Sequence, residues 1–239
     1  MSATAPMSSR ETPPAPASLS VEPLQNGDTL TALQFLRRYE AMPRAKKAEL
    51  IEGVVYMGSP VRIKQHSAPD NLVQGWLCLY SARTPGTEAA TNATSILDID
   101  NVPLPDALLR LLPECGGRTH VNDDGYLVGG PELAAEIAAS SVSIDLHDKL
   151  RAYRRASISE YLVWRTVEGR FDWFVLDGGD YRPNPSDATG VIRSRAFPGL
   201  WLNVTALLAR NAAAVMDTLE LGLKSPELAA FTARLREAK

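Results

Sequence analysis

The chain has 239 residues and is 45% hydrophobic and 22% charged, which excludes collagen-like, mucin-like and wholly disordered proteins. Its 25 basic and 28 acidic side chains give a net charge of −3, so nucleic acid must bind through a local basic patch rather than a global field. No apolar run reaches the ~18 residues of a membrane span, and the first residues lack the apolar stretch of a secretory signal. We therefore expect a cytoplasmic protein with no membrane partner.

The N-terminal segment is rich in proline, serine and alanine and has few large apolar side chains. Such a segment cannot offset its ordering entropy by burial, so we expect a disordered leader over residues 1–28. Apolar residues at helical spacing predict a first helix over residues 29–40, with Asp28 or Thr29 as its N-cap.

The next part of the chain alternates between strand and helix patterns. Residues 49–57 predict two strands that turn at Gly53, and an apolar stripe over residues 66–82 predicts a helix. Two further strands are predicted over residues 94–99 and 103–112. Glycine and proline residues separate these elements.

The second half of the chain contains a short apolar run at residues 131–139, which favours a buried strand, although its alanines leave a helix open. A helix is predicted over residues 145–156, and a hairpin is predicted from strands at 160–165 and 171–176. We interpret residues 211–239 as a C-terminal helical extension.

Two carboxylates stand at strand positions, whereas phosphate-binding loops, dinucleotide fingerprints, nucleophile elbows and zincin helices are absent from the sequence. Asp106 opens one apolar strand and Glu136 interrupts another. Burying a charged side chain in such a strand costs free energy unless the charge is paired or binds a cation. Two converging carboxylates offer hard oxygen ligands that suit Mg²⁺. The alternatives are a buried ion pair with an arginine for Glu136 and an ordinary Pro-Asp turn for Asp106.

A lysine lies on the helix that follows. Asp145, Lys149 and Tyr153 recur at i, i+4 and i+8 and share one helix face. One interpretation is a solvated Asp–Lys pair; the other is a lysine at the border of the core that holds a water or offsets charge on a phosphate. Glu49 could complete a metal site, while His66, at a helix start, is more typical of a capping or packing histidine than of a base.

Six short motifs occur in a fixed order over about residues 29–210. They are Glu49-Leu-Ile-Glu-Gly53, His66 before an apolar helix, Pro105-Asp106, Pro131-Glu-Leu-Ala-Ala-Glu136, Asp145-Leu-His-Asp-Lys149 with Tyr153, and Ser159-Glu-Tyr-Leu-Val163. In order and spacing they resemble the Uma-two restriction endonuclease family, whose members look like PD-(D/E)XK nucleases.

The resemblance implies a restriction-endonuclease-like three-layer α/β core, with a mixed central sheet flanked by helices and a metal site at one sheet edge. Asp106 and Glu136 resemble the motif acids, and Glu49 resembles the family's early glutamate. Lys149 resembles the family's lysine, because the usual superfamily position is Ala138 here. His66, Asp145 and Tyr153 remain accessory candidates.

The leading hypothesis is an endonuclease that hydrolyses DNA phosphodiester bonds with Mg²⁺ or Mn²⁺ as cofactor. Asp106, Glu136 and Lys149 would be catalytic, and Asp106, Glu136 and Glu49 would bind the metal. A basic neighbourhood is expected over residues 145–170, which hold six basic and four acidic side chains. The rival hypotheses are a catalytically silent protein that binds nucleic acid or a partner protein, and a carboxylate-pair glycosidase. A homodimer stays open.

Overall fold

The computed structural model describes residues 21–42, 47–58 and 60–237. Its centre is a six-stranded mixed sheet in the order β11-β10-β9-β8-β5-β3, in which β8 and β9 are parallel and the other neighbours antiparallel. The strands are β3 (Thr87–Thr91), β5 (Ala107–Leu111), β8 (Leu133–Ala138), β9 (Glu160–Arg165), β10 (Arg170–Asp177) and β11 (Asp180–Pro183).

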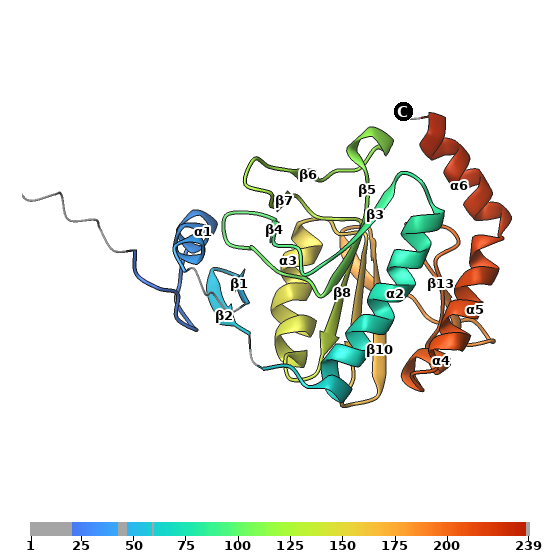
Figure 1. Ribbon diagram of the computed structural model, residues 1–239, viewed down its shortest axis with the longest axis horizontal. Helices are drawn as coiled ribbons and strands as arrows, with labels where there is room; N and C mark the ends of the chain where they lie inside the picture. Colours follow the sequence, from blue (N-terminus) through green and yellow to red (C-terminus); the bar gives the residue numbers. More distant parts are fainter. Residues whose placement is uncertain (1–20, 43–46, 59, 238–239) are drawn as a thin grey trace, which may run out of the picture.

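Helices cover both faces of this sheet and make three layers (Figure 1). One face packs against α2 (Ala68–Arg83), α4 (Val204–Leu208), α5 (Ala212–Leu223) and α6 (Pro226–Glu237), and the other packs against α3 (Leu150–Arg155). A π-helical turn precedes two of these helices: η1 (Ile63–Ser67) leads into α2, and η3 (Ile144–Lys149) leads into α3. The predicted mixed sheet between helices is therefore confirmed.

Smaller elements surround the sheet. Helix α1 (Ala32–Glu40) packs on the hairpin of β1 (Ala48–Ile51) and β2 (Val54–Met57), and these share an apolar cluster of their own. The remaining elements are β4 (Ser95–Ile96), η2 (Pro113–Cys115), β6 (His120–Val121), β7 (Leu127–Val128), β12 (Val191–Arg193) and β13 (Trp201–Asn203). Within the described ranges, no helix is long and apolar enough to cross a bilayer.

Strand β8 shows why residues 131–139 form a strand rather than a helix. Leu133, Ala135 and Ile137 face the cluster under α2, whereas Ala134 and Ala138 face the cluster under α3. All six residues of the strand are buried, as expected for a central strand covered on both sides. Glu136 falls on the α3 face by this alternation.

The N-terminal part differs from the sequence-based expectation. Residues 1–20 of the expected leader lie outside the described residues, but residues 21–28 pack on the β1–β2 hairpin, with Leu24 only 5% exposed. Val55 exchanges backbone hydrogen bonds with this segment. The N-cap of α1 is Thr31, not Asp28 or Thr29, because Thr31 forms a capping box with Gln34.

Two strand predictions were too long, and several strands were missed, among them β3 of the central sheet. The strand expected over 94–99 is only β4, and the one expected over 103–112 begins at Ala107, because Pro103 and Pro105 have no amide hydrogen to donate to a ladder. Edge strand β3 was not predicted, since its sequence Thr-Glu-Ala-Ala-Thr lacks an apolar alternation.

Leu24 provides a test of the N-terminal packing. Leu24→Ala should lower the free energy of unfolding by about 2–4 kcal/mol, because it empties a buried site next to α1 and the hairpin. Leu33→Ala is the matched control; Leu33 is 78% exposed, so the change should be within about 0.5 kcal/mol. Urea unfolding followed by circular dichroism measures both, and equal effects would contradict the packing of residues 21–28.

Candidate active site

A buried lysine lies at the centre of the site. Lys149 is 3% exposed, and its Nζ is 2.9 Å from Glu49 Oε1, 3.0 Å from Glu136 Oε1 and 3.6 Å from Asp145 Oδ1. The solvated Asp–Lys pair is therefore wrong, and so is an arginine partner for Glu136. The lysine reaches back from its helix to the strand acid, as the resemblance implies.

Each of these carboxylates is held by a second partner. Tyr153 donates its hydroxyl to Glu136 Oε1 at 2.7 Å, and Ser141 donates to Asp145 Oδ2 at 2.6 Å. The amide of Leu104 donates to Glu49 Oε1 at 2.7 Å. Strands β1 and β8 and helix η3 thereby place their acids around one ammonium group, which we call the Lys149 cluster (Glu49, Glu136, Asp145, Lys149 and Tyr153).

A second group of ligand-type side chains contains His66, Asp70 and Asp106. One ligand atom from each lies within 4.8 Å of the other two. His66 Nε2 is 3.4 Å from Asp106 Oδ1, and the amide of Ile137 donates to Asp106 Oδ2 at 2.8 Å. Asp70 Oδ1 is buried and accepts no hydrogen bond from any residue in the described ranges. We call these three residues the Asp106 cluster.

The two clusters meet where β5 and β8 pair. The ladder ends at the pair Ala107 and Ala135, so Asp106 directly precedes one member of this last pair and Glu136 directly follows the other. Asp106 also binds the amide of Ile137, the residue after Glu136. Glu136 lies within β8, whereas Asp106, predicted to open a strand, lies in the bend just before β5.

Charge is unbalanced in the Lys149 cluster. Burial raises the pKa of Glu136 well above its ordinary value, and Asp145, Asp106 and Glu49 raise it further against the opposing effect of Lys149. Burial also raises the pKa of Asp145. Burial alone would lower the pKa of Lys149, but the surrounding carboxylates outweigh it and raise that pKa, so the lysine stays charged. One cation thus faces more negative charge than it can balance.

In the Asp106 cluster the charge imbalance falls on Asp70. A hydrogen bond to Asp106 raises the pKa of His66. Burial would raise the pKa of Asp106, but the contacts with His66 and Ile137 lower it overall. Burial and the neighbouring Asp106 raise the pKa of Asp70. A carboxylate that raises the pKa of its neighbour by like-charge repulsion is typical of sites that hold a cation.

Sequence reasoning missed Asp70, because the helix was interpreted only by its apolar stripe. A usable signal was present, since Asp70 follows His66 by four residues and can share its helix face. The expected basic neighbourhood over 145–170 is largely neutralised. The arginines bound by acidic partners there are Arg151, Arg154, Arg155 and Arg165.

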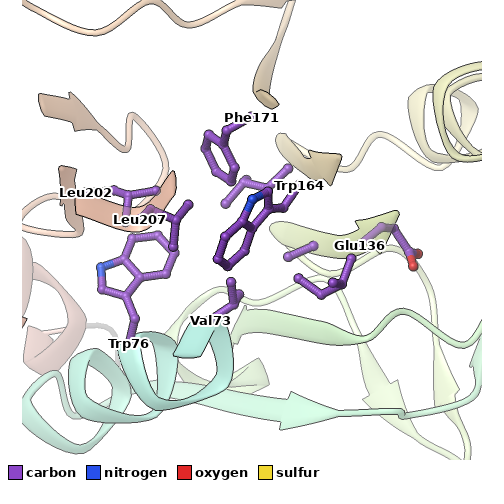
Figure 2. Close-up of a pocket in the computed structure, with 10 residues that line it drawn as sticks. Val73, Trp76, Glu136, Trp164, Phe171, Leu202 and Leu207 are labelled. Atoms are coloured by element: carbon purple, nitrogen blue, oxygen red, sulfur yellow. The ribbon is translucent and has the colours of Figure 1, made fainter. Parts of the chain in front are cut away.

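An apolar void between α2 and the sheet is not part of this site. It measures about 10 Å³, the size of a single water at most, and is lined by side chains such as Trp76, Trp164 and Phe171. Figure 2 shows the Glu136 carboxylate pointing away from these rings, so the acid serves the opposite face of the sheet.

Comparison with known proteins agrees with this architecture. The family model described as Uma2, putative restriction endonuclease, matches residues 33–205. The crystal structure of a putative nuclease belonging to DUF820 from Anabaena variabilis superposes with a TM-score of 0.57, covering 75% of this chain and 98% of that chain at 12% identity. At this identity the likeness shows the fold alone. No curated protein matches the chain.

The charge imbalance predicts a pH-dependent stability for Lys149→Met. Removing the ammonium leaves Glu136 and Asp145 buried with raised pKa values; such carboxyls favour the fold while protonated and oppose it as the pH rises through their folded-state pKa. The variant should lose about 3–5 kcal/mol at pH 8 and less at pH 5.

The matched control is Lys224→Met, because the Lys224 side chain is 74% exposed. It should change the stability by less than about 0.5 kcal/mol at both pH values. Urea unfolding at pH 5 and pH 8 measures the difference. An equal loss for Lys149→Met at the two pH values would contradict the charge imbalance.

Proposed function

The chain belongs to the Uma2 putative restriction endonuclease family, and on that premise we propose that it is a metal-dependent endonuclease that hydrolyses DNA phosphodiester bonds. The observation that carries the proposal is the Lys149 cluster, which adjoins the Asp106 cluster. A buried ammonium held by carboxylates, with a second acidic group beside it, is an arrangement that a divalent cation would complete so that negative charge developing on a phosphate is stabilised.

The residues fit a divalent cation. Two carboxylates and an imidazole come together in the Asp106 cluster, and the buried Oδ1 of Asp70 has no partner among the described residues. Carboxylate oxygens suit Mg²⁺ and Mn²⁺, whereas the imidazole of His66 shifts the preference towards Mn²⁺. Asp106 is therefore the central proposed ligand.

Two ligands proposed from the sequence, Glu136 and Glu49, already contact Lys149. Lys149 and Tyr153 both reach Oε1 of Glu136, so Oε2 is the atom proposed to face the cation from β8. Oε1 of Glu49 forms a salt bridge with Lys149 and accepts a hydrogen bond from the Leu104 amide. Its proposed contribution is therefore mainly to hold the lysine.

Hydrolysis joins a water oxygen to phosphorus and breaks one P–O ester bond, whose oxygen leaves with a proton. A bound divalent cation supplies Lewis-acid polarisation of the phosphate and activates water. Lys149 offsets the charge that develops on the phosphate, and Glu136 with Asp145 keeps it protonated. Tyr153 orients Glu136, and His66 orients Asp106.

The nuclease assay uses supercoiled plasmid DNA with Mn²⁺, Mg²⁺ or EDTA. Asp106→Asn, Glu136→Gln and Lys149→Ala should each reduce nicking at least 100-fold, because each removes a ligand or the charge that stabilises the transition state. Asp180→Asn is the control, since Asp180 lies in the β10–β11 turn region and pairs only with Arg154 among the described residues. Metal-dependent DNA binding without nicking by the wild-type protein would favour the silent binding protein.

Asp70→Asn tests the metal ligands apart from activity. Mn²⁺ affinity, measured by calorimetry, should fall at least tenfold, because the variant loses a charged oxygen ligand. The melting temperature without metal should stay equal or rise, since the Asp70 charge is opposed by burial and by Asp106. Unchanged Mn²⁺ affinity would remove Asp70 from the site.

A further inference from the structure

A segment beside the Asp106 cluster exposes both apolar and basic side chains. All of Pro60–Lys64 is exposed, with Val61 at 60% and Ile63 at 74%. Arg62 and Lys64 alternate with these aliphatic residues. Single exposed aliphatic side chains are common on protein surfaces, but a close pair flanked by cations is typical of an interaction surface.

Backbone contacts fix this segment next to the candidate active site. The carbonyl of Arg62 accepts hydrogen bonds from the amides of His66 at 2.9 Å and Ser67 at 3.2 Å. Ile63 and His66 thus belong to one π-helical turn, η1, at the start of α2 (Figure 1). A ligand that contacts Ile63 therefore lies within about one helical turn of the Asp106 cluster.

The turn between β9 and β10 extends the same surface. Thr166 donates its hydroxyl to the carbonyl of Gln65 at 2.5 Å, which places the turn against η1. Val167, the next residue, is 67% exposed. The apolar part of the surface is therefore formed by two segments that are far apart in the sequence.

The charges of this surface are available to a partner. Arg62 and Lys64 form no salt bridge with any residue of the described ranges, in contrast to the arginines of the 145–170 stretch. An apolar protein partner would have to bury both cations without a counter-ion. A polyanion with apolar surface between its charges satisfies both kinds of side chain.

We infer that this surface, defined by Pro60–Lys64 and Val167, binds duplex DNA beside the scissile phosphate. The inference rests on the proposed function and names the residues that hold its substrate. Arg62 and Lys64 contact backbone phosphates, and Ile63 contacts sugar and base edges in the minor groove, where apolar side chains commonly insert. The DNA is thus held by the same helical turn that carries His66.

The test measures the affinity for a fluorescein-labelled 20-base-pair duplex by anisotropy at several NaCl concentrations, with Ca²⁺ in place of Mn²⁺. Arg62→Ala with Lys64→Ala should weaken binding at least tenfold and lower the slope of log K against log salt by about 1.8, because two phosphate contacts are lost. Ile63→Ala should weaken binding about threefold to tenfold and leave the slope unchanged.

Matched controls remove the same kinds of side chain at other places on the surface, so they test whether the effect depends on position. Arg37→Ala with Arg182→Ala removes two exposed arginines from α1 and β11, and Leu221→Ala removes an exposed aliphatic side chain from α5. Both should change the affinity less than twofold. All variants are at exposed positions, and their melting temperatures should match that of the wild-type protein.

The outcomes distinguish this inference from the proposed function. If the wild-type protein binds and nicks DNA but the Arg62 and Lys64 variant retains the wild-type salt slope, the inference is wrong and the proposed function stands. The same holds if Ile63→Ala behaves like Leu221→Ala. If the wild-type protein neither binds nor nicks DNA, both are wrong, and a protein partner becomes the explanation of the surface.

Discussion

The burial of one ammonium group among carboxylates constrains how separate parts of the chain meet. Glu49 comes from the peripheral hairpin, Glu136 from the central sheet, and Lys149 from the helical turn on the sheet's far side. Desolvating these charges costs free energy that the contacts offset only while all partners stay in place, since a missing partner leaves a buried charge uncompensated. The Lys149 cluster therefore couples the position of the hairpin to that of strand β8.

The same constraint separates structural from chemical roles among the acids. Lys149 contacts Glu49, Glu136 and Asp145 and also helps to lower the pKa of Asp106, but among the described residues it forms no salt bridge with Asp106 or Asp70. His66 offers only one hydrogen bond to that second pair. Positive charge is thus lacking on the Asp106 side, which is where a cation and a phosphate together would restore balance. The protein retains carboxylate repulsion there that a purely structural ion-pair network would not need.

Sequence reasoning succeeded where one local pattern determined the outcome. The buried run around Glu136 predicted β8, and the hairpins at 49–57 and 160–176 followed from strand runs with turn residues between them. It failed where tertiary contacts decide: β3 is a strand because it pairs with β5, and Leu24 is buried because a hairpin lies beneath it. Asp70 was missed because its role depends on Asp106, which is distant in sequence. The surface charges were misjudged because arginine partners such as Glu52 and Asp180 lie outside the 145–170 stretch.

The π-helical turns explain how Lys149 reaches the strand acid, a contact that the family resemblance implied but that the helical spacing alone left open. In a regular α-helix, residues i and i+8 differ by about 80° around the axis, so Asp145 and Tyr153 would lie towards opposite borders of the shared face. A π turn contains more residues than an α turn, so η3 rotates less per residue and offsets this drift. Asp145, Lys149 and Tyr153 can therefore all face the buried site. Such turns are rare, and nothing in local propensity encodes them. Here η1 carries His66 and η3 carries Lys149, so the irregular geometry occurs where both helices present side chains to the site.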